Sequence, residues 1–232
     1  MISKNQKNRR LWLLACGLGI PIGVAVGQAI SFGIGFTTGS AKIWAMGLVL
    51  GPALTGMVLG VAQWVILRDR LILRDRPILR DHSLPAYRWI VVTSVGWTAG
   101  HTVTTLVGNA VYGIVNLALW PTSNLAAVWG VSGLVSGLVS GAIGGVLVGL
   151  AQGWVLRERR WTSHHWILST SLAWAIGHAV INVVHFTQLG IESSVLSWVI
   201  YGLVYGMVTR PPIHPNPRLG CSETHELDKI LE

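Results

Sequence analysis

The sequence predicts an all-α, polytopic membrane protein, and three observations support that fold class. The chain is 51% hydrophobic and only 11% charged, whereas soluble domains typically carry about 25% charged residues. Its mean hydropathy is +0.56, and its charged residues form short clusters between long uncharged segments. A pattern of tryptophan, glycine and glutamine recurs along the chain, which indicates an internal repeat of helical units.

Six apolar segments are predicted to be transmembrane helices, because about 20 residues cross a bilayer. They cover residues 11–30, 43–67, 89–110, 130–156, 166–185 and 194–209. The Gly- and Thr-rich residues 31–42 are expected to form a loop. Residues 111–124, interrupted by Pro121, are expected to form an interfacial helix or a packed loop. Residues 1–10 are a polar N-terminus, and the Pro-rich, charged residues 210–232 are expected to be disordered.

The distribution of basic residues predicts the orientation of these spans. With six spans, every one of the 17 Lys and Arg residues except Lys42 falls on the same side of the membrane. Basic residues accumulate on the cytoplasmic side, so both termini are expected there. The formal charge of +8 is spread over the ends of the apolar segments. That placement argues against a nucleic-acid-binding surface.

The spans form three similar pairs. Trp12, Trp89 and Trp166 begin the first, third and fifth spans and are separated by 77 residues in each case. A glycine follows each tryptophan 11 residues later, and each even span ends with a glycine and an arginine eight residues apart: Gly60 and Arg68, Gly149 and Arg157, Gly202 and Arg210. The chain is therefore predicted to contain three parallel helical-hairpin repeats.

The fourth span carries a glycine at every fourth position: Gly133, Gly137, Gly141, Gly145, Gly149 and Gly153. Small residues in register let helix backbones approach closely in lipid, so this row predicts glycine-zipper packing. The row could receive another helix of the same bundle, or it could dock a partner protein, a second copy or a flat ligand. Gln63 and Gln152 occupy equivalent positions in two repeats, with Tyr205 at the third, and are expected to join the repeats by hydrogen bonds.

Two histidines are the candidate cofactor-binding residues. His101 and His178 occupy the same position in their repeats, near the middle of the third and fifth spans, and each follows a tryptophan by four residues. Neutral imidazoles at that depth could ligate the metal of a haem or a chlorophyll. Alternatively, each histidine hydrogen-bonds across helices to a Thr, an Asn or a carbonyl group. The first repeat has Val24 at this position.

Residues that would support catalysis or coupled transport are missing from the spans. No Asp, Glu, Lys or Arg lies in the central part of any span, whereas ion-coupled transporters usually place charged groups there. The sequence contains no metalloprotease, redox or phosphate-loop motif. Neither an enzyme nor a metal site is therefore expected.

Gln63-Trp64-Val65-Ile66-Leu67-Arg68, and less closely the segment from Gln152 to Arg157, resemble a motif of a widespread group of bacterial membrane proteins. These proteins are rich in Trp and Gly, carry Q-W-x-x-L-R repeats and are frequent in cyanobacteria. The resemblance covers about residues 11–210. It implies a bacterial plasma membrane, or a thylakoid membrane in a cyanobacterium, and it implies no particular activity.

The sequence favours a non-catalytic packing, assembly or interaction subunit of a membrane. Its partners would be the lipid bilayer and other membrane proteins or a second copy of the chain. A haem- or chlorophyll-binding membrane protein that uses the two histidines is the alternative. A passive small-molecule pore along the axis between the three hairpins is a third hypothesis.

Overall fold

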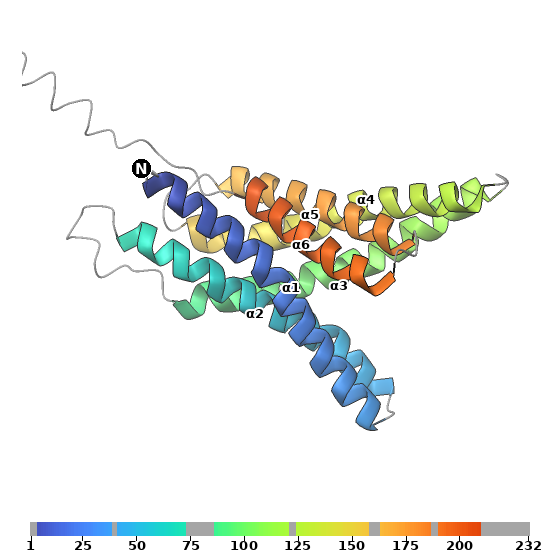
Figure 1. Cartoon of the computed structure of the whole chain (residues 1–232), viewed down its shortest axis with the longest axis horizontal. Helices are drawn as coiled ribbons and strands as arrows, with labels where there is room; N and C mark the ends of the chain where they lie inside the picture. The colour runs from blue at the N-terminus through green and yellow to red at the C-terminus, as the bar shows by residue number, and fades with distance from the viewer. Residues whose placement is uncertain are drawn as a thin grey trace, which may run out of the picture.

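A computed structural model of the chain describes residues 4–38, 41–72, 86–120, 124–157, 163–186 and 190–209. The elements in these ranges are six α-helices (Figure 1). They are α1 (Lys4–Thr38), α2 (Ala41–Ile72), α3 (Ala86–Leu119), α4 (Leu125–Arg157), α5 (Ser163–Phe186) and α6 (Gly190–Val208). The predicted all-α fold is confirmed. The tail predicted for residues 210–232 lies outside the described residues.

Five of the six helices are long and apolar enough to cross a membrane. Their described apolar segments are Arg9–Ile30, Val49–Leu67, Ala86–Leu119, Leu125–Leu156 and His164–Val184. In α6 the described apolar segment, Val195–Val208, is shorter. The prediction of a helical membrane protein therefore agrees with the lengths and compositions of these helices.

Two of the predicted loops are wrong. Residues 31–38, expected to be a loop because of their Gly and Thr content, continue α1 as a helix. Residues 111–119, expected to form a separate interfacial segment, continue α3. Helix propensity is a weak determinant inside a continuous apolar segment. Pro121 lies two residues beyond the end of α3, so it follows the helix instead of interrupting it.

The fourth span begins five residues before the predicted boundary, because Asn124 caps the helix. The side-chain Oδ1 of Asn124 accepts a hydrogen bond of 3.1 Å from the backbone nitrogen of Ala127. The Asn124 carbonyl accepts another of 3.0 Å from the backbone nitrogen of Val128. An asparagine at this position satisfies amide groups that the first helical turn leaves free.

The six helices form a closed ring in which each helix packs against its neighbours in the chain. The ring closes where α6 packs against α1. Beyond the shared bundle, the outer halves of α1 and α2 run together and diverge from the α3–α4 pair, which extends in another direction (Figure 1). The molecule therefore consists of a six-helix core and two diverging arms.

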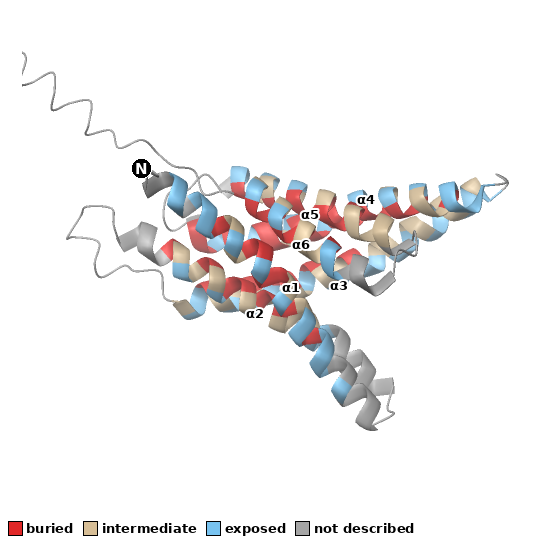
Figure 2. Cartoon of the chain, in the orientation of Figure 1, coloured by how far each residue is buried: buried red, intermediate tan, exposed pale blue. Residues whose placement is uncertain are grey.

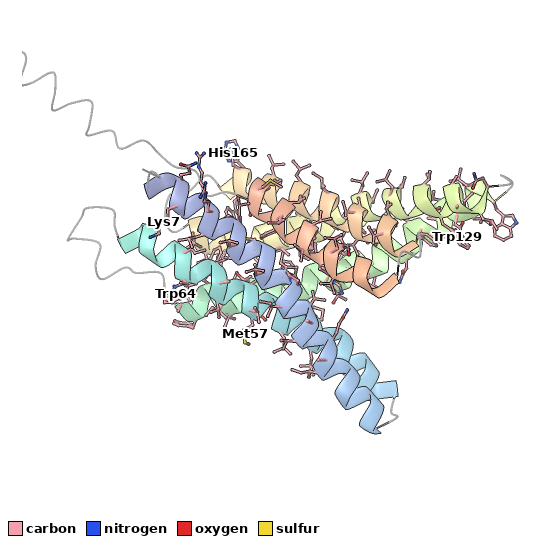
Figure 3. All side chains as sticks on the ribbon, in the orientation of Figure 1. Lys7, Met57, Trp64, Trp129 and His165 are labelled. Carbon is pink, nitrogen blue, oxygen red and sulfur yellow. The ribbon has the colours of Figure 1, made fainter. Side chains whose placement is uncertain are left out.

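Buried residues concentrate in the shared bundle, whereas the outer part of the α3–α4 arm is mostly exposed or half-buried (Figure 2). Lys7 on α1 and His165 on α5 lie at one end of the molecule, and Trp129 on α4 lies at the opposite end (Figure 3). The largest completely buried side chains are, by volume, mainly aromatic residues and two glutamines. The core is thus aromatic and partly polar, and it lies between the diverging arms and the end that carries Lys7.

Candidate functional site in the bundle core

The three tryptophans that begin the hairpins meet in the core. The rings of Trp12 and Trp166 lie edge to face with centroids 6.3 Å apart and an interplanar angle of 71°. The rings of Trp89 and Trp166 have the same separation and an angle of 67°. All three side chains are buried. Edge-to-face pairs of this kind are favourable beyond their buried area, so this layer holds α1, α3 and α5 together.

A buried hydrogen-bond network centred on Gln152 adjoins the tryptophans. Its Nε2 donates to Oε1 of Gln63 at 3.3 Å and to Oγ1 of Thr93 at 3.2 Å. Its Oε1 accepts from Nε1 of Trp166 at 3.1 Å and from the hydroxyl of Tyr205 at 3.3 Å. One amide from α4 thereby contacts α2, α3, α5 and α6. The structure thus brings both sequence-predicted glutamines into one network.

The reasoning from sequence missed Cys16 and Thr93 in this layer. Nε2 of Gln63 lies 3.9 Å from the Cys16 sulfur, and both residues are fully buried. Cys16, Thr93 and Thr170 each follow a hairpin tryptophan by four residues. Applying the 77-residue spacing to that position, as well as to the tryptophans, would have identified all three.

A second aromatic layer lies on the far side of this network. Trp97 and Trp174 lie edge to face with centroids 4.8 Å apart, and Tyr201 contacts both rings, at 6.1 Å and 6.3 Å. Nε1 of Trp174 and the hydroxyl of Tyr201 are buried and have no hydrogen-bond partner within the described part of the chain. Leaving a buried polar group unpaired costs about 1–3 kcal/mol.

His101 and His178 form a pair next to this aromatic layer. Their ring centroids are 6.4 Å apart with an interplanar angle of 44°. His178 is only 6% exposed, and its ring packs against Trp174 at 5.1 Å and Tyr201 at 5.4 Å. His101 is half-buried. Neither imidazole hydrogen-bonds to another described residue, so the expected cross-helix bonds to Thr, Asn or carbonyl groups are not seen among these residues.

The neighbouring polar residue on α5 has a different partner. Nδ2 of Asn182 donates to Oγ of Ser136 on α4 at 3.1 Å. On the same pair of helices, Oγ of Ser171 donates to the Ala142 carbonyl at 2.9 Å. Near His178, the hydrogen bonds between α4 and α5 therefore use Ser and Asn and leave the His178 ring free of such bonds with the described residues.

The glycine row of α4 faces α5. A Cβ atom added at Gly141 would lie 2.5 Å from the carbonyl oxygen of Trp174. Added at the three other characterised positions of the row, it would lie within 2.6–2.8 Å of α5 backbone atoms: Gly137 near Ala179, Gly145 near Ser171 and Gly149 near Ile167. Gly133 and Gly153 are also buried. The α5 backbone thus occupies this groove, and these glycines do not form an open flat pocket beside His178.

The two imidazoles are the candidate ligands that the described residues bring together. Within the described ranges, no group of three or more His, Cys, Asp or Glu side chains is arranged to hold a metal ion. A nitrogen pair remains possible, because imidazole is a good ligand for several transition metals.

Comparisons with family models, with curated proteins and with solved structures find no match to this chain.

Proposed function

We propose that this protein is an integral membrane protein with a non-catalytic assembly or interaction role. The observation that carries this proposal is the position of Gln152. Its amide forms hydrogen bonds, through both its donor and its acceptor groups, to residues of four other helices. Buried polar side chains satisfied by one another make a core rigid and specific. A rigid core that supports two exposed arms suits a scaffold.

The proposed membrane topology has six spans with both termini in the cytoplasm. Four described basic residues support it: all are exposed, and all lie at the end of the bundle where α1 begins. They are Lys7, Arg9 and Arg10 on α1 and Arg88 on α3. Helix α6 has 19 residues, which corresponds to about 28 Å at 1.5 Å per residue. That length is close to the hydrocarbon thickness of about 30 Å.

The proposed internal repeat is supported by the composition of the core layers. Trp12, Trp89 and Trp166 share one layer, as described above. Two sets of equivalent residues on the even helices are also fully buried. One set is Gln63, Gln152 and Tyr205, and the other is Leu59, Val148 and Tyr201. Helical hairpins that repeat around a common axis would place equivalent residues at equal depth.

The proposed interaction surface is the arm formed by the outer parts of α3 and α4. The glycine row is not available for a partner, because α5 already packs on it. In contrast, Leu106, Ile114 and Leu117 of α3 are 66%, 68% and 78% exposed. Such residues are available to lipid or to another membrane protein, because none of the six described helices covers them.

Site-specific photo-crosslinking in native membranes tests this role. A photoreactive amino acid at Leu117 is expected to capture another polypeptide, whereas the same group at the buried Trp89 is expected to capture none. The matched control is Val61 of α2, which is 43% exposed and lies outside the α3–α4 arm. Only lipid adducts at Leu117, or equal capture at Leu117 and Val61, would contradict a specific partner on this arm.

A haem- or chlorophyll-binding protein is the second candidate function, and the 6.4 Å separation of the two imidazoles supports it. The packed glycine row opposes it, because α4 and α5 would have to separate to admit a macrocycle between them. The visible absorption spectrum of protein purified from its native host is the test. A tetrapyrrole band that disappears in both His101→Ala and His178→Ala would favour this candidate, and a colourless folded protein would reject it.

A pore along the axis of the three hairpins has less support. Trp12, Trp89 and Trp166 pack together near that axis, and the Gln152 network adjoins them. These side chains occupy the position that a conducting path would need.

A further inference from the structure

We propose that His101 and His178 together coordinate one low-charge transition metal ion, with Cu(I) as the best match. The two residues come from α3 and α5 and meet beside the second aromatic layer. This site is independent of the assembly role proposed above, which does not use either histidine.

The spacing of the two rings fits one bridging ion. A metal–nitrogen bond to imidazole is about 2.0 Å long, so two such bonds account for roughly 4 Å of the 6.4 Å between the ring centroids. The remaining distance, about 1.2 Å on each side, is close to the radius of an imidazole ring. A direct hydrogen bond between the rings would require a shorter separation. The interplanar angle of 44° is compatible with a two-coordinate ion, because each ring can rotate about its metal–nitrogen bond.

The surroundings leave the imidazole nitrogens available. No other described residue forms a hydrogen bond with either ring, although the side chain of His178 is only 6% exposed. The aromatic rings of Trp174 and Tyr201 pack against the ring of His178. Nε1 of Trp174 and the hydroxyl of Tyr201 have no hydrogen-bond partner among the described residues. Because an indole N–H only donates, the two imidazoles are the groups of this cluster that can ligate an ion.

The packing favours a single ion over a tetrapyrrole. The rings of Trp174 and Tyr201 lie directly against His178, and the α5 backbone fills the glycine groove of α4. Gly100, one residue before His101, packs against the carbonyl of Gly144, where an added Cβ would lie only 2.8 Å away. A macrocycle would displace several of these contacts, whereas a single ion is far smaller.

The charge of the site favours a monovalent ion. No Asp or Glu occurs in the sequence between Asp81 and Glu158, or between Glu158 and Glu192. Carboxylates are therefore absent from all described parts of α3, α4 and α5. Placing an uncompensated charge in a medium of low dielectric constant is costly, and the cost rises steeply with charge. Cu(I) carries one charge, accepts two nitrogen ligands and is stable at low coordination number, whereas Zn(II) carries two charges and prefers four ligands.

Metal retention by the purified full-length chain tests the site. The protein is purified in detergent without a polyhistidine tag, stripped with a chelator and incubated anaerobically with Cu(I) and a chromogenic competitor ligand. We expect one Cu per chain by elemental analysis and an X-ray absorption spectrum of two nitrogen ligands. His101→Ala and His178→Asn are each expected to weaken Cu(I) binding by more than about tenfold.

The matched control is the double substitution of His164 and His165 by Ala. These exposed histidines also lie close together, with centroids 4.1 Å apart, and their loss should leave Cu retention unchanged. Size-exclusion chromatography and thermal unfolding identify any variant that misfolds, and the half-buried His101 is the position more tolerant of substitution.

Parallel incubations with haemin and with Zn(II) distinguish a site for bare Cu(I) from a site for a tetrapyrrole or for a divalent metal ion. Failure to retain Cu(I), or retention that both histidine variants leave intact, would overturn the proposal. Haemin binding that requires both histidines, with no retention of the bare ion, would overturn it in favour of the tetrapyrrole candidate. Neither result would bear on photo-crosslinking at Leu117, so the two proposals fail separately.

Discussion

Nε1 of Trp166 on α5 donates a 3.1 Å hydrogen bond to Oε1 of Gln152 on α4, and the same indole packs edge to face against Trp12 and Trp89. One side chain thus belongs to both the apolar layer and the polar layer of the core. The stability of the bundle should consequently depend on the Gln152 amide as strongly as on the tryptophan rings.

Replacing Gln152 with Leu is expected to lower the free energy of unfolding by about 3 kcal/mol or more. Leucine has a similar size, but it would remove the four buried hydrogen bonds that Gln152 makes with Gln63, Thr93, Trp166 and Tyr205, and a buried group that loses a partner costs about 1–3 kcal/mol. Thermal unfolding in detergent measures the effect. Leu150→Ala on the same helix, at a 49% exposed position, is the control. Equal stability of the two variants would contradict the role of the network.

Replacing Gly141 with Ala is expected to destabilise the protein by more than about 2 kcal/mol, because overpacking forces the surrounding backbone to shift. The added Cβ would lie 2.5 Å from the Trp174 carbonyl. Gly130→Ala provides a matched control on the same helix, because no atom lies within 4 Å of its added Cβ. That substitution should be neutral or should stabilise by up to about 1 kcal/mol, since glycine is the poorer helix former. Equal effects at both positions would argue against close α4–α5 packing.

Replacing Ser94 with Ala is expected to loosen the contact between α3 and α2. The Ser94 hydroxyl donates a 2.7 Å hydrogen bond to the Ala53 carbonyl, and such interhelical bonds in membranes contribute about 0.6 kcal/mol and up to 1.7 kcal/mol. Thr102→Ala should have less effect, because its exposed hydroxyl bonds to the Thr98 carbonyl of the same helix. Unfolding titrations of both variants compare the two bonds directly, and a larger loss for Thr102→Ala would count against this interface.

Cys16 is expected to resist maleimide labelling in the folded protein and to react once the protein unfolds. Its side chain is fully buried, and buried structural thiols are inert. The experiment uses Cys221→Ser, which removes the other cysteine, a residue outside the described ranges. Gly206→Leu should accelerate labelling, because a Cβ at Gly206 would already lie 3.0 Å from that of Cys16. Rapid labelling of the unmodified bundle at low temperature would show that α6 does not cover Cys16.

Much of the core could be predicted from sequence because it depends on spacing. The equivalent Gln63 and Gln152, expected to join by hydrogen bonds, bond to each other, whereas the 77-residue spacing of the tryptophans did not by itself predict that they would meet in the core. Positions with the same spacing along successive helices are expected at equal depth if the proposed repeat holds, so this contact requires no knowledge of long-range packing.

The divergence of the arms and the role of Tyr201 could not be predicted in this way. The loop expected at residues 31–42 was placed too early, since residues 31–38 continue α1, because hydropathy and Gly content do not determine where a helix ends within a continuous apolar segment. The contact of Tyr201 with His178 depends on how α5 and α6 pack. Its equivalents, Leu59 and Val148, carry no polar group that would have indicated such a site.

The closure of the ring between α1 and α6 has a consequence for biosynthesis. Gly202 and Gly206 pack on the backbone and side chain of Cys16 and on Leu13, so the side of the first helix that faces α6 is covered only once the last helix has been made. At 5–20 residues per second, roughly 10–30 s separate the synthesis of these two helices. During that interval the nascent first hairpin must be sheltered by lipid, by the insertion machinery or by a chaperone. A ribosome-bound chain that stops before α6 should consequently be a preferred target for membrane proteases.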